Sequence, residues 1–436
     1  MYSRHLLARR AALIAAFACL LAPGAPATAS EGNWVPKGHY LSFDRSRNLQ
    51  TAMLDLLERP HAAQSSYHLG IAQNLHEALQ TPGVKGVWMQ FAWRDVEVAD
   101  GKYDWSMIDA NMDVLRDYGL KLIIKIADRS FNGVEVMPDY FPAEYVLQTE
   151  GGGKYGYTSK RWAPYVYNRL IRLHEAIANR YRSHLAFGGI ATAETATGNF
   201  SGGDYTVEKY AAALDEVVTR TQAALERGRL FFYLNFLKGG DASDMNQDQR
   251  VKLLKSVPHE NLVIGAPDIT PDVQGMPRSV TAYRLHVRRN LPEVQQFCHL
   301  QHIDQGQGNV NVKNNQHRQA YFDEIARVRD REQQAWFQGV PAVFELDDLR
   351  DSQDRKVDVH PQAVLGELWT PSELFRYGRR NFGCDYFMWH YREHPNEGEF
   401  TWSDIRAVIR DNPCFYHPQG CAGAAQAAMP RAPGLR

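Results

Sequence analysis

The chain has 436 residues, of which 44% are hydrophobic and 23% charged, and its formal net charge is −1. This is a globular composition with enough apolar residues for a large core, which excludes a wholly disordered chain. A nearly neutral charge gives no broad attraction for nucleic acid or anionic lipid, so we expect neither as a partner.

The first thirty residues have the pattern of an export signal. A positively charged start that ends at Arg10 precedes an apolar run at 11–21, and the small residues of a cleavage site follow at 27–29. The apolar run is too short to span a bilayer, and no later stretch approaches the length needed. We therefore predict a cleaved signal peptide at 1–29, no stable membrane insertion, and a mature protein in the periplasm or outside the cell.

Four cysteines remain after such a cleavage, in a compartment that permits disulfides. Cys414 and Cys421 flank a short loop with proline and glycine, so a local disulfide is expected there. Cys298 and Cys384 lie in apolar strand-like runs, and we expect them to be buried thiols.

Along the chain, apolar runs of strand length alternate with segments of helical periodicity. The predicted strands are 38–44, 86–93, 121–128, 187–195, 229–236, 261–269, 294–304, 340–348 and 384–392. The predicted helices include 106–118, 163–183, 207–227, 317–336 and 371–380. Nearly continuous apolar strands separated by helices predict a parallel sheet covered on its outer face. Without a glycine-rich dinucleotide turn, this favours an α/β fold with one closed (β/α)8 TIM barrel.

The barrel is expected to occupy residues 34–412 as a single domain. Residues 413–436 would form a cysteine-containing loop and a disordered tail rich in Ala, Pro and Gly. Nine candidate strands compete for eight places: either 38–44 is the first strand and a later run is an excursion, or 38–44 lies outside the barrel. Two polar loops, 151–157 and 305–315, are long enough to form rims over a site.

The most informative motif follows the predicted strand 86–93. Trp93 is followed four residues later by Glu97, then by the turn 101–104 with the pattern Gly-x-Tyr-Asp, and by Gly-Leu-Lys at 119–121. This order resembles the second-strand region of the large clan A of retaining (β/α)8 glycosidases, which holds cellulases, mannanases and β-galactosidases. The resemblance implies an enzyme that cleaves a glycosidic bond in a poly- or oligosaccharide.

In that clan a proton-donating Glu ends the fourth strand and a nucleophilic Glu ends the seventh. Here Glu194 closes the apolar run 187–194 and Glu345 closes 340–345, and barrel strands deliver their last residues to the catalytic face. The resemblance thus implies Glu194 as general acid/base and Glu345 as nucleophile, with Asp347 as a competing nucleophile. A pair of carboxyl groups about 5–5.5 Å apart would fit retention.

One position departs from the clan pattern. The clan has Asn before the donor, where it binds the sugar hydroxyl beside the reacting carbon, but this chain has Ala193. Asn235, in the run 229–236, or Asn199 could take its place.

Further residues are candidates for sugar contacts. Trp389 matches the clan's last-strand Trp, which forms the floor of the sugar subsite by stacking on a pyranose. Trp389, Trp93 and Trp88 could equally be core residues. The predicted substrate-binding set is Trp93, Glu97, Asn235, Asp268, His302, Trp389 and His390.

No motif indicates a metal or a cofactor. His299 and His302 lie three apart in a strand-like run, so they point to opposite faces and cannot chelate one ion. There is no His-Glu-x-x-His, phosphate loop or Gly-x-Ser-x-Gly elbow. We therefore expect an exported glycoside hydrolase. The alternatives are a non-catalytic glycan-binding barrel and a metal-dependent esterase or deacetylase acting on a glycan.

Overall fold

A computed structural model describes most of one compact unit of the chain, residues 35–416. The described residues are 35–43, 49, 75–130, 133–151, 154–197, 204–235, 237, 244–266, 284, 287–300, 371–391 and 402–416. The predicted signal peptide and the tail after residue 416 lie outside them. No described helix is long and apolar enough to cross a membrane.

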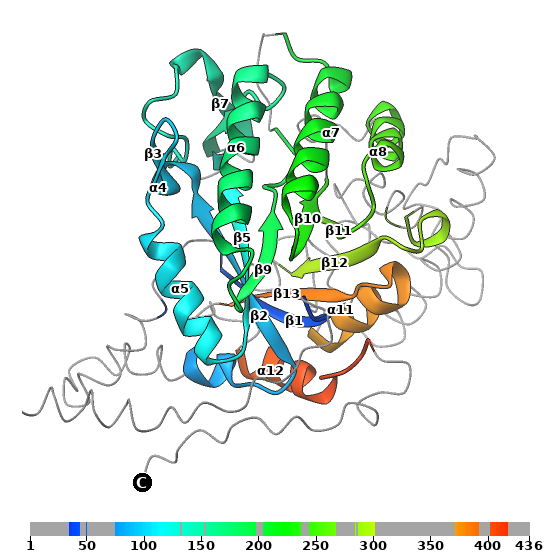
Figure 1. Cartoon of the computed structure of the whole chain (residues 1–436). Helices are drawn as coiled ribbons and strands as arrows, with labels where there is room; N and C mark the ends of the chain where they lie inside the picture. Colours follow the sequence, from blue (N-terminus) through cyan, green and yellow to red (C-terminus); the bar gives the residue numbers. More distant parts are fainter. Residues whose placement is uncertain are drawn as a thin grey trace, which may run out of the picture. The chain divides into compact units, whose positions relative to one another are not determined.

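Eight parallel strands form a closed barrel, in the order β1-β2-β5-β9-β10-β11-β12-β13 and back to β1 (Figure 1). Their bounds are β1 Gly38–Phe43, β2 Val84–Ala92, β5 Lys121–Ala127, β9 Phe187–Ala191, β10 Arg229–Tyr233, β11 Leu262–Ala266, β12 Gln295–Leu300 and β13 Tyr386–His390. The predicted (β/α)8 barrel is confirmed.

Barrel closure also settles which candidate is the first strand. β1 pairs with both β2 and β13, so the weak run at 38–44 belongs to the barrel. β12 pairs with β11 and β13 and holds the seventh place, which the sequence had given to 340–348. That run, with Glu345 and Asp347, lies outside the described residues, and the barrel closes without it.

Aromatic rings fill the lower part of the barrel interior. Phe231 lies with its ring centroid 5.3 Å from that of Tyr386, 5.8 Å from that of Trp88 and 6.0 Å from that of Phe297. A Cβ on Gly265 would come within 2.5 Å of the Phe297 ring, so a side chain there would displace it. These ring contacts pack this layer of the barrel interior, as side chains do in other (β/α)8 barrels.

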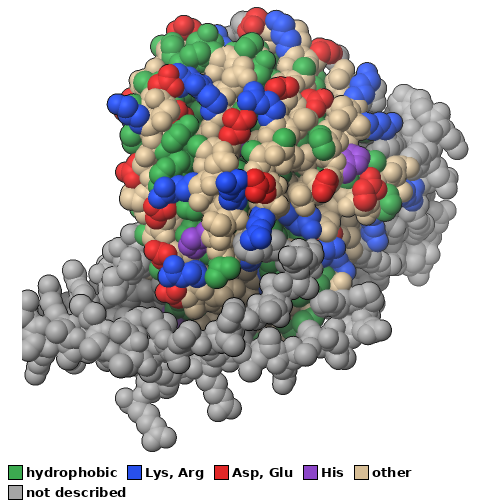
Figure 2. Space-filling model, in the orientation of Figure 1, with side chains coloured by type: hydrophobic (Ala, Val, Ile, Leu, Met, Phe, Trp, Pro, Cys, Tyr) green, Lys and Arg blue, Asp and Glu red, His purple; other side chains and the backbone are tan. Residues whose placement is uncertain are grey.

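Helices cover the outside of the strands (Figure 1). They are α5 Ser106–Asp117, α6 Pro164–Tyr181, α7 Val207–Ala224, α8 Asp244–Ser256, α11 Pro371–Tyr377, followed by the π-helical turn η3 Gly378–Phe382, and α12 Trp402–Asp411. Proline stands in the first turn of α6, and the Thr206 side chain caps α7 by accepting from the Lys209 N–H at 3.1 Å. Figure 2 shows acidic and basic side chains interspersed over this face, in keeping with the near-zero net charge.

A small antiparallel sheet follows β5 and differs from the predicted loop at 151–157. Its strands are β6 Arg129–Ser130, β7 Val146–Gly151 and β8 Lys154–Ser159, in the order β6-β8-β7, and the short 3-10 helix η1 Ala143–Tyr145 leads into β7. β7 and β8 thus pair as a β-hairpin, in which Gly151 lies opposite Lys154. The second predicted loop, 305–315, lies outside the described residues.

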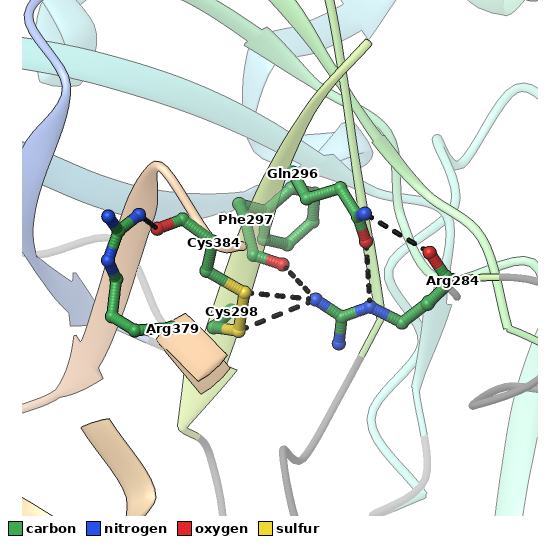
Figure 3. The surroundings of a disulfide bond; sticks show 6 residues. All are labelled: Arg284, Gln296, Phe297, Cys298, Arg379 and Cys384. Atoms are coloured by element: carbon green, nitrogen blue, oxygen red, sulfur yellow. Dashed lines mark hydrogen bonds between the residues drawn. A yellow bond between two sulfur atoms is a disulfide. The ribbon is translucent and has the colours of Figure 1, made fainter. Parts of the chain in front are cut away.

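Cys298 and Cys384 are joined in a disulfide, so the expectation of two buried thiols was wrong (Figure 3). Both residues are fully buried, with a Cα–Cα distance of 5.8 Å. They approach because β12 and β13 are neighbours, although 86 positions separate them in sequence. Buried Arg284 donates to the Phe297 carbonyl at 2.9 Å and reaches both sulfurs (Figure 3). Cys414 is also disulfide-bonded, while Cys421 lies outside the described residues.

Candidate active site

Glu194 lies three residues beyond the end of β9, the fourth barrel strand. Its side chain is 14% exposed, so it is mostly enclosed yet reachable. The segment leaves the barrel at the carboxyl ends of the strands, where (β/α)8 enzymes carry their catalytic groups. Glu194 therefore occupies the place that the sequence predicted for the general acid/base.

Asn235, just beyond β10, binds the Glu194 carboxyl group. Its Nδ2 donates to Oε2 of Glu194 at 2.9 Å. Its Oδ1 accepts from the Ala196 N–H at 2.7 Å and from the Thr195 hydroxyl at 3.1 Å. Arg250 of α8 donates to the Asn235 carbonyl at 2.6 Å. The structure thus brings the predicted residues Glu194 and Asn235 into direct contact.

A buried ion pair supports the backbone of Glu194. Arg161 donates to both carboxylate oxygens of Asp128, and its Nε lies 2.6 Å from Oδ2. The same guanidinium donates to the Glu194 carbonyl and, at 3.1 Å, to the Tyr210 hydroxyl. The Tyr210 hydroxyl in turn donates to the Thr195 carbonyl at 2.8 Å. The backbone carbonyls of Glu194 and Thr195 are therefore both held by hydrogen bonds, from Arg161 and from Tyr210.

Burial shifts the pKa values of the charged side chains near Glu194. Burial alone would raise the pKa of Asp128, but the charge and hydrogen bonds of Arg161 outweigh it and the pKa is lowered. Burial lowers the pKa of Arg129 to about 10, against the attraction of Glu194. Arg129 Nη2 lies 3.7 Å from Oε2 of Glu194. At neutral pH a cation thus remains beside the candidate acid.

A chain of polar side chains crosses the barrel interior above the aromatic layer. Hydrogen bonds join Ser42 to Nε2 of His299 at 2.8 Å and Nδ1 of His299 to the Tyr233 hydroxyl at 2.6 Å. Lys125 lies over the Tyr233 ring, with its Nζ 4.9 Å from the centroid. The predicted residue His390 ends β13 and is 7% exposed. These groups come from five different strands and line the interior of the barrel.

The Trp-Glu-Gly motif forms a compact internal brace. Trp93 begins the short helix α4 Trp93–Val96, and Glu97 begins the two-stranded ribbon of β3 Glu97–Ala99 and β4 Lys102–Tyr103. The Trp93 indole donates to Oε2 of Glu97 at 2.7 Å, while the Gly101 N–H donates to Oε1 at 2.9 Å. Trp93 is 0% and Glu97 3% exposed. The spacing of this motif thus allows Glu97 to bind both Trp93 and Gly101 within one turn. The side chains of Trp93 and Glu97 are both buried, so neither is accessible to a sugar in this structure.

Trp389 points away from the barrel interior, which differs from its predicted place on the floor of a sugar subsite. Its indole donates to Nδ1 of His39 at 2.9 Å and stacks on Phe387, with centroids 6.0 Å apart. His39 is hydrogen-bonded to the Asn412 carbonyl behind the strands, and burial lowers its pKa to about 3. Side chains alternate along a strand, so Trp389 faces the helices while His390 faces inward.

Three predicted residues, Glu345, Asp268 and His302, lie outside the described residues. Ala193, which departs from the clan pattern, lines a small cavity of about 20 Å³ together with Asp128 and Arg161. No group of three or more potential metal-ligating side chains occurs in the described part of the chain.

The sequence reasoning missed Asp128, Arg129, Arg161 and the inner chain through His299. Asp128 had a usable signal, because it closes an apolar strand just as Glu194 does. Arg161 had none, since it precedes α6 in a connecting segment and meets Asp128 only after folding. His299 was considered solely as a partner of His302 for metal binding.

Residues 67–199 match the glycoside hydrolase family 42 model, described as beta-galactosidase. The matched segment is less than half of the chain and contains Trp93, Glu97 and Glu194; it confirms the resemblance to (β/α)8 glycoside hydrolases. No curated protein sequence matches the chain.

Solved structures with a similar fold have low sequence identity. A beta-galactosidase from Bacillus circulans sp. alkalophilus is 11% identical with a TM-score of 0.47, covering 87% of this chain and 56% of that one. Endo-glycoceramidase II from Rhodococcus sp. is 13% identical (TM-score 0.42), covering 86% and 78%. A sugar phosphate isomerase/epimerase from Parabacteroides distasonis is 10% identical (TM-score 0.39), covering 87% and 99%. These similarities concern the barrel and not a particular reaction.

Proposed function

We propose that this protein is an exported glycoside hydrolase in which Glu194 is the general acid/base. The observation that carries the proposal is the carboxyl group of Glu194 at the end of the fourth strand, held at one oxygen by Asn235 and only partly exposed. The family 42 match over 67–199 ends just beyond this residue and supports a glycan as substrate.

The chemistry assigned to Glu194 is proton transfer at the glycosidic oxygen. As the bond from the anomeric carbon to that oxygen breaks, Glu194 gives its proton to the departing oxygen. Glu194 then takes a proton from the water whose oxygen becomes bonded to the anomeric carbon. One water is consumed and two hydroxyl-bearing products form, so the proton returns to Glu194 at the end of the cycle.

For the second carboxylate we propose Glu345, with Asp347 as the competing candidate, because Glu345 closes an apolar run; the support from the seventh strand place is lost, since β12 holds it. In a retaining enzyme this group attacks the anomeric carbon and is released when water adds. NMR of the first-formed product tests whether such a nucleophile acts, because retention of the anomeric configuration requires one and inversion contradicts it.

Export is proposed from the N-terminal pattern, and the Cys298–Cys384 disulfide supports it because such bonds persist in oxidising compartments. Mass spectrometry of the protein recovered from cells tests this. A mature chain that begins near residue 30 is expected, and a cytoplasmic chain beginning at Met1 would contradict it.

The decisive experiment is Glu194→Gln, assayed on a panel of oligosaccharides that includes β-galactosides. We expect kcat to fall by about 100- to 10,000-fold, because the amide cannot transfer a proton. Glu208→Gln, an exposed position on α7, is the matched control and should keep full activity. Activity of the Glu194→Gln variant within a few-fold of wild type would end the proposal.

A non-catalytic glycan-binding barrel is the second candidate, and the departure at Ala193 favours it. Calorimetry with the same panel separates the two functions. An enzyme binds and cleaves, and its Glu194→Gln variant still binds, whereas a binding module binds with no turnover in either form.

A further inference from the structure

The side-chain amide of Asn235 is hydrogen-bonded to the carboxyl group of Glu194. The neighbouring backbone determines which amide atom is the oxygen and which is the nitrogen. The Ala196 backbone N–H, 2.7 Å from Oδ1, can only donate, so that amide atom must be the oxygen. Nδ2 therefore faces Glu194 and donates to Oε2 at 2.9 Å.

Burial and backbone hydrogen bonds also keep the Asn235 amide in its orientation toward Glu194. The residue is 2% exposed, and its backbone N–H donates to the Thr195 hydroxyl at 2.9 Å. Arg250 holds its carbonyl from the other side. The donor is thus present at the same place in every protonation state of Glu194.

The two oxygens of Glu194 are consequently not equivalent. Oε2 accepts from Asn235 and lies 3.7 Å from the Arg129 guanidinium. A proton on Oε2 would face an N–H donor and a cation, both of which favour a bare oxygen. Within the described part of the chain, no hydrogen bond reaches Oε1.

We infer that Asn235 is a positioning residue, which keeps Oε2 as an acceptor and leaves Oε1 to carry the transferred proton. This inference rests on the proposed function of Glu194. It gives Asn235 a role through Glu194, in place of the sugar contact expected from sequence. The same hydrogen bond stabilises the carboxylate that remains when the proton has left, so it favours the acid step as well as orienting it.

The contact itself can be tested without substrate by Asn235→Asp. In the folded variant, the new carboxyl group at position 235 and that of Glu194 would lie at hydrogen-bond distance, and two such carboxyl groups cannot both ionise, so the pair keeps one proton. In the unfolded chain the same groups lose this proton above about pH 4. Stability of N235D must therefore fall as pH rises. We expect its unfolding temperature to drop by about 5 °C between pH 4 and pH 8, relative to the control.

The control is Asn168→Asp on the exposed side of α6, where Nδ2 donates to the Pro164 carbonyl at 2.8 Å and Oδ1 accepts from Arg220 at 3.4 Å, so the new carboxylate faces a cation and no second carboxyl group forces a proton onto it. Equal pH dependence of N235D and N168D would overturn the inference, because Asn235 would then not face Glu194.

The catalytic part of the inference is tested with Asn235→Ser on two probes, phenyl and 2,4-dinitrophenyl β-D-galactoside. The dinitrophenolate departs without a proton, so only the phenyl glycoside needs the positioned acid. We expect kcat/KM to fall about 10- to 100-fold on the phenyl probe, and by less than about threefold on the dinitrophenyl probe. Equal losses on both probes would show a merely structural role and overturn the inference.

The two failures can be told apart. If Glu194→Gln leaves hydrolysis intact, the proposed function fails even when N235D shows the expected pH dependence. If Glu194→Gln abolishes hydrolysis of the phenyl galactoside but N235S lowers kcat/KM equally on both galactosides, the proposed function is retained. The positioning role of Asn235 is then rejected.

Discussion

Two walls of the barrel are held together by different interactions. The polar wall, formed by β5, β9 and β10, carries a buried ion pair between Asp128 and Arg161 and the hydrogen bonds that reach Glu194. The packed wall, formed by β12, β13 and β1, carries the Cys298–Cys384 disulfide and aromatic rings facing the helices. The polar wall thus holds a buried ion pair next to the Glu194 carboxyl group, whereas the packed wall combines a covalent link and ring packing with hydrogen bonds such as that from Trp389 to His39.

This difference has a consequence for stability. A buried ion pair is costly to desolvate and gives little net stability, but losing one partner leaves an uncompensated charge. A disulfide acts mainly by restricting the unfolded chain. Damage to the polar wall should therefore disturb both folding and the site, whereas damage to the packed wall should affect folding alone.

The largest effect on stability is expected from Asp128→Asn, which leaves the Arg161 charge buried without its partner carboxylate. We expect a loss of about 3–5 kcal/mol in the free energy of unfolding, measured by urea denaturation. The control is Asp113→Asn, since the Asp113–Arg116 pair is largely exposed and should be worth less than about 1 kcal/mol. Similar losses in the two variants would remove the distinction between the walls.

The double variant Cys298→Ser, Cys384→Ser tests the packed wall. The bond joins residues 86 positions apart, and its removal should cost about 2–5 kcal/mol while the reaction at Glu194 continues in the protein that remains folded. Alkylation followed by mass spectrometry of the native protein is the accompanying check. Two free thiols at these positions would contradict the link.

The smallest effect is expected from Trp389→Phe. The variant loses the indole hydrogen bond to His39 and some packing volume, which should cost about 1–2 kcal/mol. Because Trp389 faces the helices, hydrolysis should be unchanged. A loss of activity as large as that of Glu194→Gln would instead return Trp389 to the sugar site, as the sequence resemblance had implied.

Local patterns in the sequence determined much of this protein. The alternation of apolar strands and helices predicted the (β/α)8 barrel, and a carboxylate closing an apolar run made Glu194 the candidate acid. The Trp93, Glu97 and Gly101 motif was also readable, because its hydrogen bonds span only four residues each. These features depend on neighbours along the chain, which the sequence displays directly.

Tertiary structure alone decided the rest. Only the pairing of strands in the barrel assigned the seventh place to β12, joined Cys298 to Cys384 and brought Asn235 to Glu194. It also decided that Trp389 faces outward, since a shift of one residue along a strand reverses the face of every side chain. Contacts between strands depend on register and closure, which are set by the packing of the whole barrel and leave no mark in any short stretch of sequence.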